Sequence, residues 1–434
     1  MFKKMLTGFL VSSCFVVHAQ FWTEKSSGFT NNLIGLNRFH VVDENVAWAI
    51  AYDGVNTINN VQQFSKTEDS GSTWTAGSFD LGDTGLGISD VSGVDGTTAF
   101  VAAHPRQARQ QGGIWKTIDA GITWTQQTGA AFNSATSFPN VVHYFDANNG
   151  LAIGDPANGY WEIYRSNDGG ATYTRIPSSS LPSPLSNETG FLAQFAYSGN
   201  SIWFTTSAGR IVHSADRGVS WSVYQSPLSN FGGTTIFGDI SFATATRGVI
   251  QDNSGNLYRS TDAGANWSTI VLSGTGAPYG GAITYIPNTT SMVSTGGEVS
   301  FAGSSYSRDD GVTWINIDTD QHVDNVFFNT TVGYSGSFSN ATTSQGVFIY
   351  TENVLSENSI EDRFDLILVH NTVQEQLEIT TDQNILSTDI YDLHGRLITT
   401  STSAIINTNQ LKSGIYLAQI TTDLGKRTSK FIKQ

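Results

Sequence analysis

The sequence predicts an all-β protein in which a seven-bladed β-propeller is followed by a small β-sandwich. Three observations lead to this prediction. An Asp-Gly turn motif occurs six times at a nearly even interval, a strand–turn–strand pattern precedes each copy, and the sequence changes character near residue 358. The composition agrees with many short strands and tight turns, because the 434 residues include 44 Gly and only 9 Pro.

The repeated motif consists of Ser or Thr, any residue, Asp, any residue, Gly, two further residues and an aromatic ring. A carboxylate in this position can accept backbone N–H groups across a turn, the hydroxyl can do so more weakly, and Gly supplies a positive φ. The motif therefore predicts a hairpin turn. A role copied into every blade is structural and not catalytic, and we assign it to Asp69, Asp119, Asp168, Asp216, Asp262 and Asp309.

A second pattern precedes each motif: a strand, a short polar turn, and a strand of small and apolar residues. The stretches 39–50 and 142–153 are examples, and the pattern recurs near Val91, Phe195, Ile240, Ile283 and Val326. Four strands per repeat of 40 to 50 residues is typical of a propeller blade. Seven copies predict seven blades over about residues 21–353, with six or eight blades as alternatives.

The seventh repeat ends at residues 346–350 without a turn motif, so its outer strand is missing. The segment 21–24 resembles the strand that follows other turn motifs, such as residues 124–126. We expect this N-terminal segment to supply the missing strand. Such a donation would close the ring and remove an exposed sheet edge.

The first residues have the pattern of a secretory signal peptide. Lys3 and Lys4 supply positive charge, residues 5–17 form an apolar run, and a small-residue cleavage site ends at Ala19. Cleavage there removes the only cysteine, Cys14, so no disulfide is expected. Lipoprotein-type attachment at Cys14 is the alternative. The apolar run is too short to span a bilayer, and no later stretch approaches the required length.

The charge balance argues against a nucleic-acid partner. A formal net charge of −15, without Lys/Arg clusters, repels phosphate backbones. The sequence also lacks a Gly-rich phosphate loop, a His pair with metal-ligand spacing and a nucleophile elbow. We therefore predict no cofactor and no metal, and a monomeric protein.

The six turn motifs resemble the Asp-box (BNR) repeats of a propeller superfamily. Its members include sialidases, sortilin-type receptors, xyloglucanases and photosystem II assembly-factor-like propellers. The segments 154–156 and 164–166 are most similar to the assembly-factor-like bacterial branch. Because the superfamily mixes enzymes with binding proteins, the resemblance implies a fold and not a function. It also implies that the Asp-box turns lie on the face away from the usual ligand site.

The C-terminal region has a different pattern. Residues 390–397 predict a strand, a turn and a strand, residues 411–417 predict a turn into a buried strand, and the chain ends in the basic segment 430–433. Together they resemble the type A sorting domain of the type IX secretion system of Bacteroidota. This resemblance implies export across the outer membrane, commonly followed by removal of the domain and by surface attachment or release. An ordinary Ig-like appendage is the alternative.

These observations divide the chain into a signal peptide (residues 1–19), a propeller (20–353), a linker (354–357) and a sorting domain (358–434). We expect a mature protein that is secreted or attached to the outer-membrane surface. The secretion machinery is its predicted partner through the C-terminal domain.

Strand order within a blade predicts which face binds a ligand. If the strands are named A to D outward from the centre, the A–B and C–D turns lie on one face and the B–C and D–A connections on the other. The Asp-boxes mark the first face, so ligand contacts are expected from the second. Its candidate ligand-binding residues are Asp53, His104, Arg106, Arg109, Arg210 and Asp252, each with a solvated loop charge as the alternative.

The favoured function is a non-enzymatic binding protein that recognises a protein or glycan on this face. The alternative is a glycoside hydrolase or sialidase-like enzyme, with Asp155 and Glu298 as candidate carboxylates. Convergence of Arg38, Arg106 and Arg210 would favour a sialidase. A scaffold without a ligand pocket is the third possibility.

The segment 175–177 imitates the arginine motif of sialidases, but its position argues against that role. It follows an Asp-box strand, whereas the motif of that family precedes the first Asp-box. The resemblance therefore does not make Arg175 a ligand-binding residue.

Overall fold

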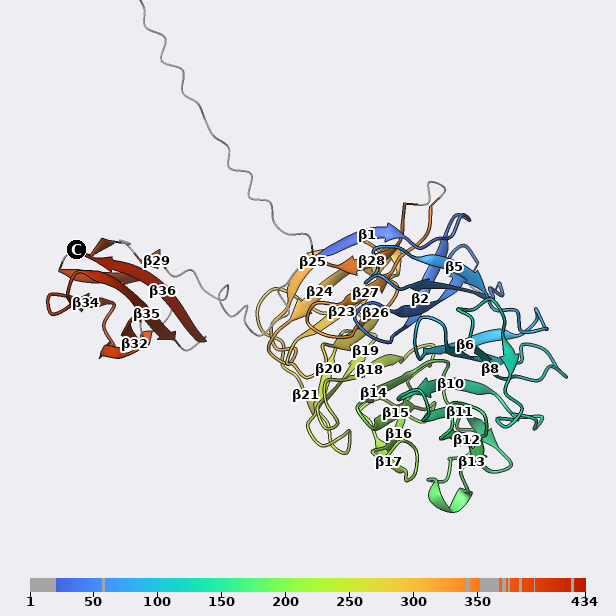
Figure 1. The fold of residues 1–434 in the computed structure, drawn as a ribbon. Coiled ribbons are helices and arrows are strands. Elements are labelled where there is room, and N and C mark those ends of the chain that lie inside the picture. Colours follow the sequence, from blue (N-terminus) through green and yellow to red (C-terminus); the bar gives the residue numbers. More distant parts are fainter. Residues whose placement is uncertain are drawn as a thin grey trace, which may run out of the picture. The chain divides into compact units, whose positions relative to one another are not determined.

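The structure is a computed structural model that describes residues 21–434 except 57–58, 341–343, 352–366, 369–371, 374, 382–384, 394 and 423–424. The predicted signal peptide and the predicted linker lie outside the described residues. The chain forms two compact units, Met1–Glu352 and Asn353–Gln434 (Figure 1). Apart from two 3-10 turns, η1 (Ser178–Ser180) and η2 (Val299–Phe301), the regular elements of the described residues are strands. No described helix is long and apolar enough to cross a membrane.

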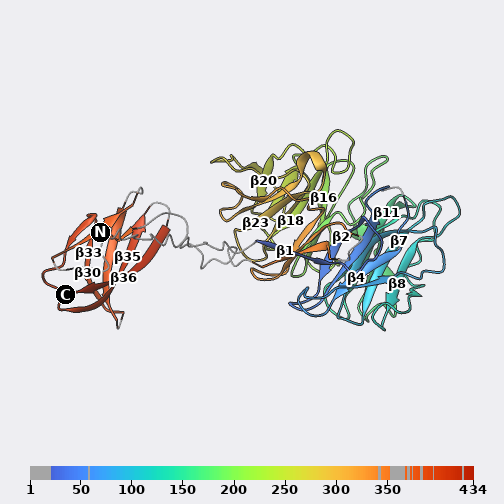
Figure 2. The same ribbon diagram turned by 90° about the horizontal axis from the view of Figure 1, so that it is seen from above.

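The first unit is a ring of seven four-stranded antiparallel sheets (Figures 1 and 2). Blade 1 contains β2 (Ile34–Val41), β3 (Ala47–Asp53), β4 (Gln63–Thr67) and β5 (Thr75–Ser78). Blade 2 contains β6 (Gly87–Gly93), β7 (Ala99–His104), β8 (Gly113–Thr117) and β9 (Thr125–Gln126). Blade 3 contains β10 (Pro139–Tyr144), β11 (Gly150–Ala157), β12 (Tyr160–Ser166) and β13 (Thr174–Arg175). Blade 4 contains β14 (Phe195–Ser198), β15 (Ser201–Thr205), β16 (Arg210–Ser214) and β17 (Ser222–Gln225).

The remaining blades complete the ring. Blade 5 contains β18 (Gly238–Phe242), β19 (Gly248–Asp252), β20 (Leu257–Ser260) and β21 (Ser268–Thr269). Blade 6 contains β22 (Ala282–Tyr285), β23 (Met292–Gly296), β24 (Gly303–Ser307) and β25 (Ile315–Asp318). Blade 7 contains β26 (Asn325–Phe327), β27 (Gly333–Gly336), β28 (Gly346–Tyr350) and β1 (Trp22–Ser26). The predicted number of blades is therefore confirmed.

The N-terminal strand closes the ring, as the sequence predicts. β1 pairs antiparallel with β28, with Trp22 opposite Tyr350. The Trp22 side chain is 2% exposed, and its Nε1 donates a hydrogen bond to Ser304 Oγ in blade 6 at 3.1 Å. Trp22 therefore packs in blade 7 and links it to blade 6 through a hydrogen bond.

The six Asp-box turns share one set of hydrogen bonds. At the fifth turn, Ser260 Oγ donates to Asp262 Oδ1 at 2.9 Å, and the same oxygen accepts Asn266 N–H at 2.9 Å. Gly264, with a φ of 91°, donates its N–H to Ser260 Oγ at 2.9 Å. Equivalent bonds recur at Asp69, Asp119, Asp168, Asp216 and Asp309. Side-chain oxygens thus accept N–H groups of the turn, which have no partner in a neighbouring strand.

Replacing Asp262 with Ala is expected to lower the free energy of unfolding by about 1 kcal/mol, because the turn loses these hydrogen bonds. Chemical denaturation followed by circular dichroism measures the change. Binding to the opposite face should stay intact, so a large loss of ligand affinity in a folded Asp262→Ala protein would contradict the structural role.

The second unit is a β-sandwich. Its three-stranded sheet contains β29 (Ile367–Leu368), β31 (Gln376–Thr380) and β34 (Ile405–Asn407). Its five-stranded sheet contains β30 (Thr372–Val373), β36 (Gly425–Lys433), β35 (Gly414–Thr422), β32 (Ile385–Asp392) and β33 (Leu397–Ser401). Side chains of both sheets form one core, which includes Leu377, Ile406, Ile390, Ala418 and Phe431.

Candidate ligand-binding cavity

A cavity of about 1540 Å³ opens on the propeller face that carries the B–C and D–A connections, here called the loop face. Segments from blades 1, 2, 5, 6 and 7 contribute to its wall, including the connections 59–61, 253–255, 278–281 and 296–301. None of the six Asp-box aspartates is among the described residues of the wall. The cavity therefore lies where the strand order predicts ligand contacts.

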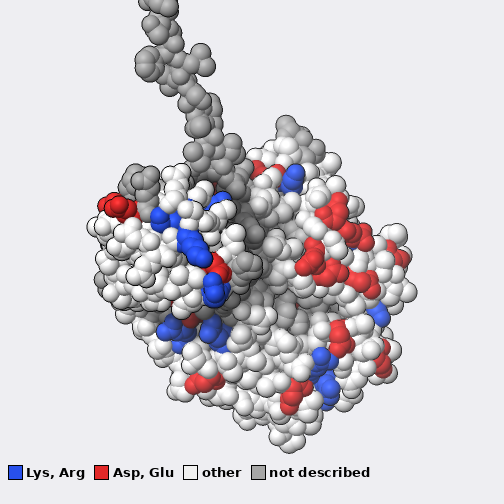
Figure 3. Space-filling view, turned by 60° about the vertical axis from the view of Figure 1, so that its left-hand side comes forward, with Lys and Arg blue, Asp and Glu red and all other residues white. Residues whose placement is uncertain are grey.

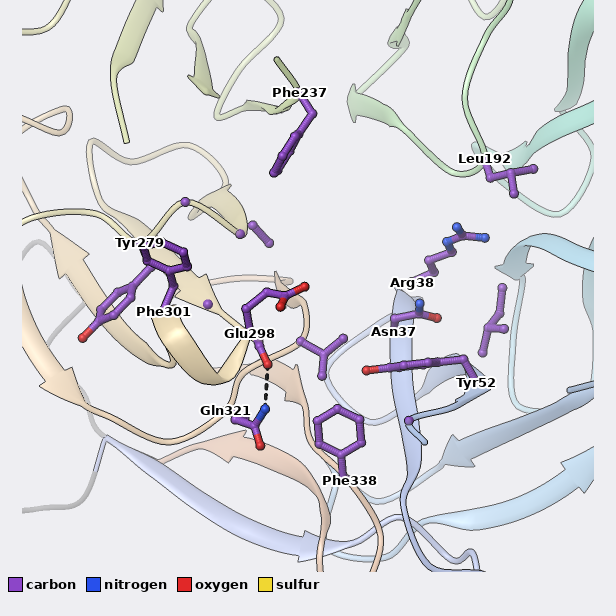
Figure 4. A pocket seen from close by; sticks show the side chains of 18 of the residues that line it. Asn37, Arg38, Tyr52, Leu192, Phe237, Tyr279, Glu298, Phe301, Gln321 and Phe338 are labelled. Atoms are coloured by element: carbon purple, nitrogen blue, oxygen red, sulfur yellow. Dashed lines mark hydrogen bonds between the residues drawn. The ribbon is translucent and has the colours of Figure 1, made fainter. Parts of the chain in front are cut away.

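Aromatic side chains form much of the cavity rim (Figure 4). Phe301 is 67% exposed and Phe237 is 42% exposed, although both are large apolar groups. Deeper in the wall, the rings of Tyr52 and Phe338 meet edge to face with their centroids 5.9 Å apart. Covering exposed rings stabilises a complex by roughly 25 cal/mol per Å² of apolar area. The rim thus offers apolar area to a ligand.

The segment that carries Phe301 also presents a carboxylate. Glu298 precedes η2, whose turn is fixed by a hydrogen bond from Phe301 N–H to Glu298 O at 2.8 Å. Gln321 Nε2 holds the preceding residue through Gly297 O at 2.8 Å, as Figure 4 shows. Among the described residues of the wall, Glu298 is the only carboxylic acid.

Arg38 lies at the base of the cavity because β2 is irregular there. The strand carries a bulge between Asn37 and Phe39, and Arg38 has a φ of 53°. Its N–H donates to Asp324 Oδ2 at 2.8 Å, and its Nη1 donates to Ser89 O at 2.7 Å. Burial lowers the pKa of Arg38, and the nearby Asp90 and Asp324 act in the opposite direction. Because of the bulge, Arg38 places its basic side chain at the base of the cavity.

Two of the residues predicted for ligand binding, His104 and Arg106, line the same cavity. His104 Nδ1 lies 2.9 Å from Ser89 Oγ, and its ring packs on Phe138 with centroids 4.7 Å apart. Burial lowers the pKa of His104 to about 4, and the charges of Arg38 and Arg106 add to this effect. The imidazole is therefore neutral at physiological pH.

The candidate carboxylates Asp155 and Glu298 are not brought together. Asp155 is absent from the described cavity wall, and its Oδ1 accepts hydrogen bonds from Asn140 Nδ2 and Gly190 N–H, both at 2.8 Å. Burial raises the pKa of Asp155, and these two bonds act against that rise. Its carboxylate therefore links strand β10 to the connection that contains Gly190.

Three further candidates also bond within the scaffold instead of lining the cavity. Arg210 forms an ion pair with Glu188 and donates its Nε to Glu188 Oε1 at 2.9 Å. Asp252 Oδ1 accepts the N–H groups of Ser254 and Asn256 at 2.9 Å each.

Asp53 braces its own loop in the same way, because its Oδ1 accepts the N–H of Val55 at 2.8 Å. The last candidate, Arg109, is an exposed loop residue with a φ of 73°. It lies outside the described wall of the cavity. Of Arg38, Arg106 and Arg210, whose convergence would favour a sialidase, Arg38 and Arg106 line this cavity and Arg210 does not.

Sequence reasoning missed the aromatic residues of the rim and wall: Tyr52, Phe237, Tyr279, Phe301 and Phe338. The only available signal was a large ring inside a Gly-rich connection, as at Phe301 between Gly297 and Gly303. Among the described residues, no three His, Cys, Asp or Glu side chains are grouped closely enough to hold a metal ion.

The C-terminal residues 371–434 match the family model described as secretion system C-terminal sorting domain. No curated protein matches the sequence significantly. Among solved structures, YCF48 bound to D1 peptide matches with 15% identity and a TM-score of 0.52, over 77% of this chain and 97% of that chain. YCF48 from Cyanidioschyzon merolae matches with 14% identity and a TM-score of 0.52, over 77% and 99%.

The GH74 xyloglucanase from Xanthomonas campestris matches with 11% identity and a TM-score of 0.50. The match covers 93% of this chain and 60% of that chain. These identities are low, so the likeness extends to the fold alone. Residues 371–434 are therefore a secretion system C-terminal sorting domain, and the unit before it is a seven-bladed β-propeller of the architecture found in YCF48 and GH74 enzymes.

Proposed function

We propose that this chain is a secreted or cell-surface binding protein that recognises a protein or glycan in the loop-face cavity and catalyses no reaction. The sorting domain supports export by the type IX secretion system. The solved relatives include a propeller bound to a peptide and a glycoside hydrolase, so both kinds of ligand suit the architecture. The aromatic rim is the observation that carries the proposal.

Exposed rings on a rigid rim favour recognition. Phe301 and Phe237 are exposed by 67% and 42%, and both are held on connections between strands of a closed ring. Aromatic side chains lose little conformational entropy when a ligand covers them, and they supply a large contact area. The acidic group of Glu298 and the basic groups of Arg38 and Arg106 add polar contacts that fix orientation.

The described wall has fewer of the groups that a glycoside hydrolase or a sialidase requires. Hydrolysis of a glycosidic bond generally requires two carboxylic acids on opposite sides of the bond. Glu298 has no second carboxylic acid beside it among the described wall residues, and the other candidate, Asp155, bonds to Asn140 and Gly190 outside that wall. A sialidase-like clamp is not favoured either, since Arg210 is paired with Glu188.

Glycan and peptide arrays with the protein lacking residues 1–20 should identify the ligand. Phe301→Ala and Phe237→Ala are each expected to weaken binding roughly tenfold, as for aromatic anchors of an interface. Ile122→Ala is the matched control, because Ile122 is 79% exposed and lies within an Asp-box turn, outside the described wall of the cavity. Binding that is unchanged in both Phe variants would contradict the proposed site.

A panel of sialosides and β-glucans tests the enzymatic alternative. The proposal predicts no release of sugar from any of them. Turnover that disappears in Glu298→Gln would instead establish a glycosidase and overturn the proposal.

A further inference from the structure

A second cavity, of about 940 Å³, lies at the other end of the propeller's centre. Its wall includes the A–B turns, such as Val42, Val94 and Asn288. These turns lie beside the Asp-box turns, because Ala263 N–H in an Asp-box bonds to Thr246 O in the A–B turn of the same blade. The second cavity therefore opens on the Asp-box face, and Arg38 is the one described residue that lines both cavities. We call the second cavity the axial cavity.

The described wall of the axial cavity includes four aspartates, one of which, Asp146, forms an ion pair with Arg217. Of the other three, two lie on innermost strands and one lies directly before such a strand. These three are Asp90 in blade 2, Asp239 in blade 5 and Asp324 before β26 of blade 7. Each accepts a backbone N–H from the next blade of the ring, at 2.8 to 3.1 Å: the donors are Val142, Ile283 and Arg38, respectively. The scaffold thus fixes these carboxylates in position. A carboxylate oxygen has two lone pairs, so each oxygen retains one for a further donor.

If all three carboxyl groups were ionised, the axial cavity would carry an excess of negative charge. Arg38 is the only Lys or Arg among the described residues of its wall, and it lies near Asp90 and Asp324. Burial raises the pKa of Asp90 to about 8. Burial also raises the pKa of Asp239 to about 7, and the neighbouring Asp324 adds to that rise. A further positive charge would stabilise the ionised carboxylates.

A buried imidazole supplies an independent sign of a missing ligand. His143 is 2% exposed and lines the axial cavity, and its Nδ1 has no hydrogen-bond partner. Burial keeps its pKa well below the usual value, so the ring is neutral and has one acceptor nitrogen. An unsatisfied buried polar atom is costly, by about 1–3 kcal/mol. A donor from a bound molecule would remove that cost.

The same cavity contains a partly open aromatic surface. Tyr197 is 39% exposed, and its ring lies 4.3 Å from the His143 ring and 6.0 Å from the His40 ring, centroid to centroid. Phe195 packs beside both Tyr197 and His143. Aromatic faces attract cations and cover methylene groups.

We propose that the axial cavity binds a small alkylammonium ligand, whose N–H groups bond to the Asp90, Asp239 and Asp324 carboxylates and to His143 while its methylenes lie on Tyr197. The ligand must be slender, because Asp90 is only 3% exposed on its inner strand. A bare metal ion fits less well, since no three acidic or imidazole groups among the described residues are close enough to coordinate one. This site does not depend on the function proposed for the loop face.

Isothermal titration of the full chain with spermidine at low salt tests the site. Saturable binding with one site per chain is expected, and Asp239→Asn should weaken it at least tenfold, in proportion to a lost buried charge contact. Asp80→Asn is the matched control, because Asp80 is exposed and lies outside the axial cavity. The control is needed because acidic side chains are abundant on the propeller surface (Figure 3). Absence of saturable binding, or an equal loss in Asp80→Asn, overturns the proposal.

A second pair of variants keeps the test decisive if Asp239→Asn does not fold. Tyr197→Leu and His143→Phe leave the carboxylates in place and should each weaken spermidine binding several-fold. Thermal melts followed by circular dichroism establish that the variants are folded. Wild-type affinity in both folded variants overturns the proposal, as does tight binding of Ca²⁺ that excludes spermidine.

The affinity should also depend on pH. The titratable groups of the described wall are Arg38, His40, Asp90, His143, Tyr144, Asp146, Tyr197, Asp239, Tyr285 and Asp324. Asp90 and Asp239 are neutral below their raised pKa values and charged above them. Spermidine affinity is therefore expected to rise as the pH increases from 6 to 9. A flat profile over this range contradicts the assigned carboxylates.

Discussion

Replacing Trp22 with Ala is expected to lower the free energy of unfolding by about 3–5 kcal/mol, the usual cost of truncating a fully buried Trp. The side chain is 2% exposed and packs beside His322, Phe327 and Tyr350. The substitution also removes the hydrogen bond to Ser304 in the neighbouring blade. β1 is the strand that the N-terminal segment supplies to blade 7, so the loss of its packing weakens the closure of the whole ring.

Urea denaturation followed by far-ultraviolet circular dichroism measures this effect without relying on Trp fluorescence. Thr23→Ala is the matched control, since Thr23 lies in the same strand but is only partly buried. Its effect should stay within about 1 kcal/mol, the range for sites without a special structural role. A Trp22→Ala protein as stable as the Thr23→Ala protein would show that β1 contributes little to closure.

Deleting residues 358–434 is expected to abolish export in a host that has the type IX secretion system. The deletion removes the segment that matches the sorting-domain family, residues 371–434. The propeller is a compact unit of its own, so it should still fold and should accumulate in the periplasm. Cell fractionation and protease treatment of intact cells measure where the protein resides.

The full-length chain, produced at the same level, is the control for this experiment. Circular dichroism of the purified truncated protein checks that the propeller is folded. If the truncated protein reaches the cell surface in the same amount as the full chain, the sorting role of the C-terminal domain is contradicted.

The scaffold was predictable because its signals are local. The bonds among Ser260, Asp262 and Gly264 lie within five residues, so one short pattern encodes the whole turn. The strand–turn–strand pattern that precedes the motif occurs seven times and thus predicts the number of blades. The strand that closes the ring was also predictable, because a blade without an outer strand and an N-terminal segment with strand character complement each other.

The ligand-binding candidates were less predictable, because their partners are distant in sequence. Asp155 bonds to Gly190, and Arg210 pairs with Glu188, more than 20 residues away in each case. The local sequence around a charged loop residue does not indicate whether its side chain faces solvent, a ligand or such a partner. Arg38 presents a different difficulty. A single bulge in β2 breaks the alternation that assigns side chains to one face, and sequence alone does not reveal it.

The aromatic rim depends on the closed ring and not on any one segment. Phe237 lies between blades 4 and 5, whereas Phe301 lies within blade 6, so the two rings share a cavity only after the blades assemble. Each ring alone resembles an ordinary loop or strand residue. The exposure that suggests a binding role is therefore a property of the tertiary structure.

Ring closure by the N-terminal strand is the claim on which both proposed sites depend, and a cysteine cross-link tests it most directly. Thr23 lies directly opposite Ile349, so Thr23→Cys combined with Ile349→Cys in a chain lacking residues 1–20 should oxidise to an intramolecular disulfide, detected as the loss of both thiols. The control pair Thr23→Cys and Phe348→Cys places the sulfurs on opposite faces of the sheet and should remain reduced. Equal reactivity of the two pairs, or no cross-link in the first, would contradict a closed seven-bladed ring.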